Sequence, residues 1–374
     1  MNSILPLIKN NIDPDTKTQK KVKALIQQLC KDSSLEYDEF LYLLDNISPV
    51  TATYLKESAY QAKQPHYGDK VYLRSLIEIS NYCTRGCLYC GISRYNTSVN
   101  RYRLTIDEIL ESCESAYLLG YKTFVLQAGE DPALSKEFIS NVIITIKNKY
   151  PDTRITLSLG EQTKDTYQAW FDSGADRYLL RHETASPKLY ESVHSKDMSL
   201  DIRMKCLQDL RDIGYQVGAG FMVGLPNQIN ADLVQDILFL KELNPHMVGI
   251  GPYLCHEDTI LKGNDSGTLE ETLVLLSIVR LLLPKVLLPS TTALGTIAKN
   301  GRELGLKAGA NVLMPNVSPT QYRKDYEIYQ NKICLTDTAE TCYFCIRGRI
   351  RKYNHQADFS VGDHVDIKRS VTND

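Results

Sequence analysis

The hydrophobic pattern of the chain changes in character near residue 70. Before that point, apolar residues recur at helical spacing over residues 22–29 and again over residues 40–44. No alternation of the kind that strands show is present in this part. We therefore expect an N-terminal helical extension over residues 1–68.

From residue 71 onward, short apolar runs alternate with longer amphipathic stretches. Eight runs are typical of strands: 71–79, 122–127, 154–159, 176–181, 216–222, 247–251, 286–291 and 311–314. The stretches between them predict helices over 105–119, 135–149, 163–173, 199–213, 231–243, 269–283 and 296–304. A glycine follows several of these helices, where a left-handed residue commonly ends a helix: Gly120, Gly174, Gly214 and Gly305.

This alternation predicts parallel strands joined by helical crossovers. Eight repeats over about 245 residues fit an α/β fold of the (βα)8 TIM-barrel type, with a doubly wound open sheet as the alternative. We expect the barrel over residues 69–320. A C-terminal extension over residues 321–374 should follow, its last 25 residues lying on the surface. Both architectures place functional residues at the carboxyl ends of the strands.

Composition narrows the function classes. The 374 residues include 43 Lys and Arg against 45 Asp and Glu, for a net charge of −2, which argues against nucleic-acid binding through a basic surface. No apolar run of about 18 residues could span a bilayer, and residues 1–10 lack the pattern of a secretory signal. We expect a cytoplasmic protein that binds neither nucleic acid nor membrane.

Ten cysteines in such a chain should stay reduced, as ligands or reactive thiols. Six of them form two groups: Cys83, Cys87 and Cys90, then Cys334, Cys342 and Cys345. The other four are expected to be ordinary small buried residues: Cys30, Cys113, Cys206 and Cys255. His182 and His194 are likewise expected to be structural.

The first cysteine group has the spacing C-x3-C-x2-C directly after the first barrel strand. Three thiolates on so short a loop suit zinc or an iron–sulfur cluster. A structural zinc ion would need a fourth protein ligand, and the first histidine after Cys90 is His182. An iron–sulfur cluster held by three cysteines would leave one iron open to another ligand.

This motif, with Tyr89 before its last cysteine, resembles the signature of the radical S-adenosylmethionine (SAM) superfamily. The resemblance implies that the cysteines hold a [4Fe–4S] cluster and that SAM chelates its fourth iron. An electron donor then reduces the cluster, which splits SAM to give a 5′-deoxyadenosyl radical. The segment 127–130 resembles the Gly-Gly-Glu that holds the SAM amino group, although Ala128 replaces the first glycine.

Polar residues also follow the third and fourth strands. Arg177, Arg181 and Glu183 alternate with apolar residues, so at a period of two they should share one face. Two arginines facing a cavity would attract an anion.

Longer strings resemble the HydE family of FeFe-hydrogenase maturases: 125–132, 157–161, 176–185, 222–226, 247–252, 291–296 and 309–316. The resemblance, over about residues 35–346, implies a step in assembling the H-cluster di-iron subcluster. The radical would attack the sulfur of a cysteine-bound iron carbonyl cyanide synthon supplied by partner hydrogenase maturases, under anaerobic conditions.

The resemblance also implies residue roles. SAM and its cluster would be held by Tyr89, Gln127, Gly129, Glu130, Ser158, Glu161, Glu183, Arg203 and Met222. The substrate would contact Arg74, Thr156, Arg177 and Met314. Residues at the reaction centre would be Arg181, Thr291, Thr292 and Tyr326.

The second cysteine group resembles the accessory-cluster site of that family, and an accessory [2Fe–2S] or [4Fe–4S] cluster competes there with zinc or no metal. Two rival functions exist within the superfamily. A methylornithine synthase-like mutase would need an acid in the cavity to bind the ε-ammonium of an amino-acid substrate. Biotin synthase-like sulfur insertion would need further cysteines inside the barrel. The alternative that is not an enzyme is a non-catalytic iron–sulfur carrier.

Overall fold

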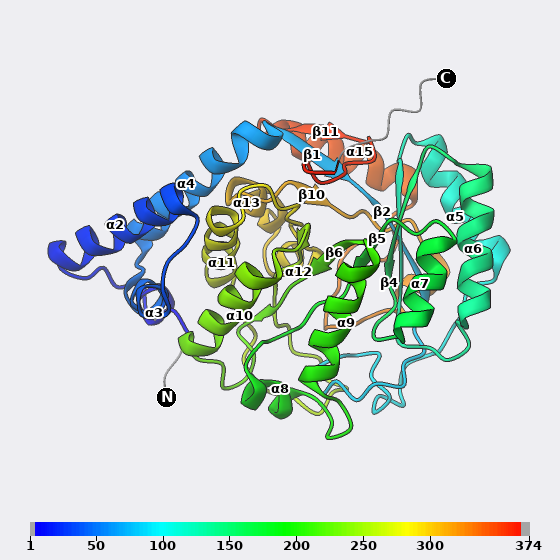
Figure 1. Cartoon of the computed structure of the whole chain (residues 1–374), viewed down its shortest axis with the longest axis horizontal. Helices are drawn as coiled ribbons and strands as arrows, with labels where there is room; N and C mark the ends of the chain where they lie inside the picture. The colour runs from blue at the N-terminus through cyan, green and yellow to red at the C-terminus, as the bar shows by residue number, and fades with distance from the viewer. Residues whose placement is uncertain (1–3, 368–374) are drawn as a thin grey trace.

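A parallel sheet of six strands makes most of a barrel wall (Figure 1). The computed structural model describes residues 4–367. The strands of this sheet lie in the order β2 (Ser75–Ser80), β3 (Thr123–Ala128), β4 (Arg154–Ser158), β5 (Arg177–Leu179), β6 (Gln216–Ala219) and β8 (Met247–Val248). Every neighbouring pair in it is parallel.

The remaining wall closes through short pairings. Leu287 bridges to Met247, and Pro289 bridges to Val312 of β10 (Val312–Leu313). In turn, β10 pairs with β1 (Lys70–Leu73), which leads directly into β2. The predicted (βα)8 barrel is therefore confirmed, and the alternative of an open sheet is not.

Four predicted strands differ from their expected form, and two of them, the runs 216–222 and 247–251, each divide into two short strands. The run 286–291 forms isolated bridges instead of a continuous strand, and the run 71–79 divides at Arg74 into β1 and β2. Beyond β6 and β8, a separate pair of short strands extends the barrel rim: β7 (Met222–Val223) and β9 (Gly251–Pro252).

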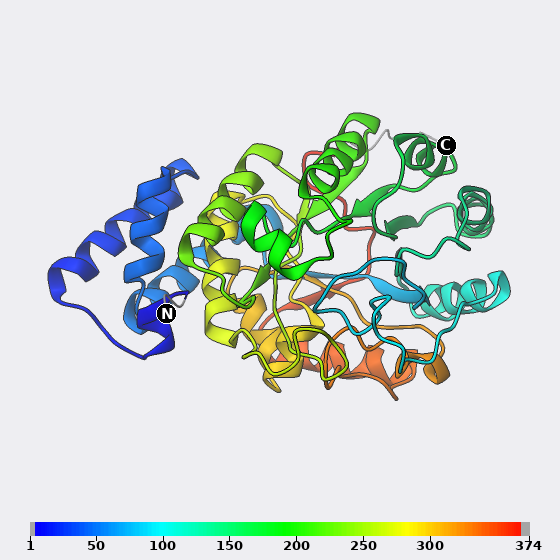
Figure 2. The same ribbon diagram turned by 90° about the horizontal axis from the view of Figure 1, so that it is seen from below.

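Helices surround the barrel at the predicted places (Figure 2). They are α5 (Ile106–Leu118), α6 (Lys136–Lys149), α7 (Lys164–Asp172), α9 (Leu200–Ile213), α10 (Asn230–Leu243) and α11 (Leu269–Leu282). The N-caps of α5 and α6, Thr105 and Ser135, accept backbone hydrogen bonds from the first turn, which satisfies donors that the helix leaves unpaired. Gly120, Gly174 and Gly214 have positive φ, as expected at helix ends.

The helical prediction over 296–304 is wrong. Two short helices occupy this region, α12 (Thr292–Ile297) and α13 (Gly301–Lys307), and a further helix, α8 (Pro187–Val193), was not predicted. Gly305 lies inside α13, where a side chain would collide with Ser290. The left-handed glycine after this helix is Gly309.

The N-terminal segment forms α1 (Pro6–Lys9), α2 (Thr16–Asp32), α3 (Tyr37–Asn46) and α4 (Pro49–Tyr67). These helices lie at one side of the barrel (Figures 1 and 2), where α4 packs on α11 and α3 packs on α10. Among residues 4–367, no helix combines the length and apolar character needed to cross a membrane.

The C-terminal segment forms α14 (Thr320–Arg323), α15 (Ala339–Lys352) and β11 (Gln356–Asp358), and β11 pairs with β1. Beyond β11 the chain crosses the amino-terminal end of the barrel, where the carbonyl of Val361 accepts hydrogen bonds from Thr123 and Arg177. The expectation of a surface extension over the last 25 residues is therefore wrong for this part. Residues 368–374 lie outside the described chain.

Candidate active site

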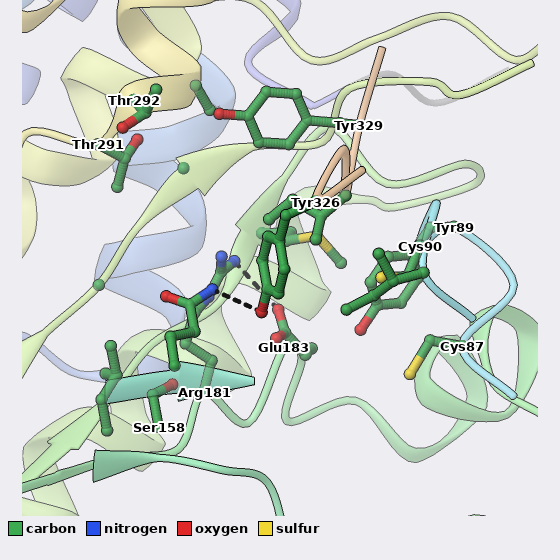
Figure 3. A pocket seen from close by; sticks show the side chains of 18 of the residues that line it. Cys87, Tyr89, Cys90, Ser158, Arg181, Glu183, Thr291, Thr292, Tyr326 and Tyr329 are labelled. Carbon is green, nitrogen blue, oxygen red and sulfur yellow. Dashed lines mark hydrogen bonds and ion pairs between the residues drawn. The ribbon is translucent and has the colours of Figure 1, made fainter. Parts of the chain in front are cut away.

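A cavity of about 350 Å³ lies at the carboxyl ends of the barrel strands. The cysteines Cys87 and Cys90 are at one side of it and Thr291 and Thr292 are at the other, with Tyr326 between them (Figure 3). The structure thus brings residues from both ends of the barrel sequence to one chamber, as expected for this fold.

The three cysteines of the first group, Cys83, Cys87 and Cys90, all line this cavity. The backbone N–H groups of Arg85 and Glu130 lie 3.4 Å from Sγ of Cys83 and donate to it. Donors of this kind stabilise negative charge on a ligating sulfur. Gly129 allows the close approach, because a side chain there would collide with the Tyr82 carbonyl.

This donor set fits an iron–sulfur cluster. Within residues 4–367, no three His, Cys, Asp or Glu side chains are placed to hold a single metal ion, whereas a four-iron cluster spaces its thiolate ligands more widely. Burial raises the pKa of the Cys90 thiol to about 12. Iron binding requires thiolates, so loading the site would release protons.

Four charged side chains surround the cysteine loop. Arg85 pairs with Glu130 and places Nη2 3.0 Å from Oε2 of Glu161. Glu161 also lies 3.2 Å from Nε of Arg203 on α9. Burial raises the pKa of Glu130, and the two arginines oppose this rise. The group ties the cysteine loop to the ends of β3 and β4.

Glu183 has a left-handed backbone, with φ of 68°, which is uncommon for a residue other than glycine. Its N–H donates to Gly220 and its carbonyl accepts from Met222, each at 3.0 Å. Its carboxylate lies 3.0 Å from Nη2 of Arg181 (Figure 3). The backbone thus holds this carboxylate at the cavity wall.

A histidine holds the ring of Tyr89 in place. The hydroxyl of Tyr89 lies 3.2 Å from Nε2 of His194, and Nδ1 of His194 lies 2.9 Å from the Tyr190 carbonyl. Burial lowers the pKa of His194 to about 3, so the ring is neutral. Because Nδ1 donates to a carbonyl, Nε2 accepts from Tyr89. His194 is therefore a positioning residue for an aromatic ring that lines the cavity beside Met222.

The inner part of the cavity carries donors without protein partners. Nε of Arg181 and the hydroxyl of Thr291 are buried and have no hydrogen-bond partner among residues 4–367. The Tyr326 hydroxyl accepts a hydrogen bond of 3.2 Å from Gln127 (Figure 3). Thr292, Met314 and Ser158 also line the cavity. Buried donors at a cavity wall are suited to bind an anionic ligand.

Three expected substrate contacts are not among the residues that line this cavity: Arg74, Thr156 and Arg177. Arg177 donates to Asp363 at 2.5 Å, and Arg74 donates to the Gly362 carbonyl at 3.2 Å. Thr156 lies on β4, two positions before Ser158, and its side chain is buried. Arg181 and Glu183 lie together on the cavity wall, as expected, whereas Arg177 does not join them because it is paired with Asp363.

Sequence reasoning missed several cavity residues. Glu78 and Lys332 form a buried ion pair on the cavity wall, and Arg85 lies inside the cysteine motif itself. Glu78 could have been noticed as a charge within the apolar run 71–79. Nothing in the local sequence marks Lys332, which comes from the C-terminal segment.

The second cysteine group lies in the C-terminal segment. Cys342 is buried, Cys334 is half-buried and Cys345 is exposed. Nη2 of Arg302, which lines the cavity, lies 3.6 Å from Sγ of Cys334. Of the scattered cysteines, Cys113 and Cys206 are buried, as expected. Cys30 is exposed and Cys255 is half-buried, so the expectation of burial is wrong for these two residues.

Comparison with known proteins gives three kinds of likeness. The family model "Radical SAM superfamily" matches residues 77–240. The chain is 46% identical to the [FeFe] hydrogenase maturase subunit HydE of Thermotoga maritima over 286 residues, which are 76% of this chain and 81% of that protein. It is 30% identical to the 3-methylornithine synthase of Methanosarcina barkeri over 269 residues, which are 71% of this chain and 75% of that protein.

A solved structure of methylornithine synthase also matches the fold, with a TM-score of 0.76 at 24% identity. The match covers 89% of this chain and 97% of that one. At this identity the likeness concerns the barrel architecture alone.

Proposed function

The chain belongs to the radical SAM superfamily, and on that premise we propose that it is a HydE-type enzyme of FeFe-hydrogenase maturation. Its substrate is a cysteine-bound iron carbonyl cyanide synthon. A [4Fe–4S] cluster on the first cysteine group supplies the electron that cleaves SAM to a 5′-deoxyadenosyl radical, which attacks the sulfur of the synthon. The 46% identity to a HydE protein, against 30% to a methylornithine synthase, supports this assignment.

The charge balance of the cavity is the observation that carries the proposal. Among the described residues, every carboxylate that lines it is already paired with a cation of the chain: Glu78 with Lys332, Glu130 with Arg85, and Glu183 with Arg181. Two further arginines line it, Arg203 and Arg302. Five cations against three carboxylates favour ligands that bring anionic groups.

The synthon fits this requirement. A cysteine whose amino group and thiolate are bound to iron presents no ammonium, only a carboxylate and cyanide. We assign these anionic groups to Arg181 and Thr291, whose buried donors lack protein partners, together with Thr292 on the same wall. Met314 and the ring of Tyr326 provide apolar surface that excludes water from a reactive radical.

SAM binding is assigned to the part of the cavity next to the cysteine loop. Its amino-acid portion meets the charged group around the cysteine loop, with Glu183 and Arg203 as direct contacts and Gln127, Gly129, Glu130, Ser158 and Glu161 in support. Tyr89 and Met222 lie together on the wall that would receive the adenosine.

The rival functions lack support in the cavity. A lysine mutase needs a free carboxylate for the substrate ammonium, and the cavity carboxylates are already paired. A sulfur inserter needs further cysteines inside the barrel, and neither Cys206 nor Cys255 is among the described cavity residues. A simple cluster carrier would have no use for the Arg181–Glu183 pair.

We further propose that an accessory [2Fe–2S] or [4Fe–4S] cluster occupies Cys334, Cys342 and Cys345. An electron donor and partner maturases complete the reaction, in an anaerobic cytoplasm. The accessory site lies outside the cavity and is not needed for SAM cleavage.

A substrate panel tests the function. The chain is reconstituted with iron and sulfide under anaerobic conditions and reduced. Release of methionine from SAM, which accompanies cleavage whatever the radical attacks, is then measured with the synthon, L-lysine or dethiobiotin. We expect only the synthon to stimulate SAM cleavage. Stimulation by L-lysine and not by the synthon would show a mutase instead.

A further inference from the structure

Strand β2 carries one acid inside the barrel. All six of its residues are buried. Ile77 and Ile79 belong to the hydrophobic core, whereas Leu76 and Glu78 line the cavity, as the period of two requires. A buried carboxylate is costly unless it is paired and hydrogen-bonded, so its partners are informative.

Both oxygens of Glu78 have partners. Oε1 lies 2.5 Å from Nζ of Lys332, and Oε2 accepts a hydrogen bond of 2.8 Å from Asn316. The side chains of Glu78 and Lys332 are 2% and 7% exposed. The lysine also donates to the Tyr326 carbonyl at 2.8 Å and lies 4.9 Å from the centre of that ring. The ammonium is therefore well held at the cavity wall.

This arrangement places a lysine of the chain where the ammonium of an amine substrate would pair with the barrel acid. We propose that Lys332 determines the class of substrate that the cavity binds. Because its ammonium pairs with the Glu78 carboxylate, substrates with a free alkylammonium group are excluded and substrates with only anionic groups are accepted. This role for Lys332 rests on the proposed function and names the residue that selects its substrate class.

The segment that carries Lys332 supports this role. Tyr326, Tyr329 and Lys332 all line the cavity, although they follow the last barrel strand in sequence. The C-terminal segment thus builds a wall of the chamber and supplies its compensating charge. Glu78 and Lys332 are 254 positions apart, so the pair forms only in the folded chain.

The test uses the full-length reconstituted chain and n-propylammonium as the probe. In Lys332→Met, the apolar stem remains but the ammonium is lost, leaving Glu78 to accept an external amine. We expect n-propylammonium to raise the melting temperature of this variant and to bind it at least tenfold more tightly than it binds the wild-type chain. In Glu78→Gln/Lys332→Met, the acceptor charge is absent and the response should vanish.

A surface lysine provides the matched control. Lys205 is 68% exposed and pairs with Asp209 at 2.7 Å, so water can solvate the carboxylate in Lys205→Met and no response to the amine is expected. An equal response in the single and double cavity variants, or no response in Lys332→Met, would overturn the proposal.

Glu78→Gln gives a test that does not depend on the folding of Lys332→Met. It leaves the lysine without its carboxylate, so propionate, and not n-propylammonium, should raise the melting temperature of this variant by more than it raises that of the wild-type chain. The opposite preference, or none, would overturn the proposal. Because these readouts need no turnover, they remain decisive even if the synthon fails to stimulate SAM cleavage.

Discussion

The Nε atom of Arg203 lies 3.2 Å from Oε1 of Glu161, at the junction of α9 and the end of β4. Arg85 reaches the other oxygen of the same carboxylate at 3.0 Å and also pairs with Glu130. Two cations and two carboxylates therefore connect the cysteine loop with the barrel strands. The position of a ligand held at the cysteines depends on this group.

The first prediction concerns Glu161→Gln. Once residue 161 is uncharged, no carboxylate at this position offsets the repulsion between the guanidinium groups of Arg85 and Arg203. We therefore expect SAM affinity to fall about tenfold, equivalent to ~1.4 kcal/mol. Equilibrium dialysis of reconstituted protein measures this, together with iron content, which should not change. Asp165→Asn removes an exposed surface pair with Lys136 and should leave SAM affinity unchanged. Unaltered binding in Glu161→Gln would contradict the assigned role.

The second prediction separates the two cysteine groups. Cys87→Ala should lose the iron of the first site and all production of 5′-deoxyadenosine, because three thiolates are needed there. Cys345→Ala, in the exposed part of the second group, should lower the iron content but leave SAM cleavage within about threefold of wild type, a difference of ~0.6 kcal/mol. Iron analysis and product quantification check both. Loss of cleavage in Cys345→Ala would contradict a non-essential accessory site.

The third prediction concerns the closed end of the barrel. Arg177 and Asp363 are 1% and 6% exposed and lie 2.5 Å apart. Asp363→Asn leaves a buried guanidinium with poorer compensation, so we expect a loss of about 3 kcal/mol in the free energy of unfolding. The pair of Asp366 with Lys285 is exposed, so Asp366→Asn should cost less than ~1 kcal/mol. Chemical denaturation compares them, and equal losses would be contrary to expectation.

This closed end shows a limit of prediction from sequence. The barrel strands were predictable because hydrophobic runs recur locally and alternate with helical patterns. The alternation also placed Arg177 near Arg181, but it could not show that the strand ends at Leu179. Nor could it show that Asp363, 186 positions later, would bind Arg177. Pairing between such distant charges depends on how the chain returns to the barrel.

The fourth prediction is a dependence of stability on pH. Burial, and to a smaller extent the charge of Lys63, lowers the pKa of His355 to about 4, although Asp69 opposes the shift. Between pH 6.5 and 4 the unfolded chain binds more protons at this residue than the folded chain does. Stability is therefore complete above about pH 6.5 and decreases as the pH falls, by at most ~1.4 kcal/mol per pH unit.

Replacement of this histidine tests the prediction. His355→Phe should flatten the fall in melting temperature between pH 6.5 and 4.5, while the wild-type chain retains the steeper fall. Parallel curves for the two proteins would show that His355 does not titrate in this way.

The candidate site was partly predictable for a chemical reason. Cys83, Cys87 and Cys90 are close in sequence, and Glu130 follows a strand end, so motif and fold together indicate one site. Lys332 carries no such mark, because its role arises from contact with Glu78. The charge balance of the cavity, on which the proposed substrate class rests, depends on contacts that the sequence does not show.

The most direct test of the central claim follows the radical itself. The reduced protein is mixed anaerobically with the synthon and with SAM carrying ¹³C at the 5′ carbon of adenosine, and the frozen sample is measured by electron paramagnetic resonance. Attack on sulfur predicts a radical with ¹³C hyperfine splitting and an adenosylated product that contains the sulfur. If 5′-deoxyadenosine forms without a ¹³C-coupled radical or a sulfur adduct, SAM cleavage stands and the proposed chemistry on sulfur is contradicted.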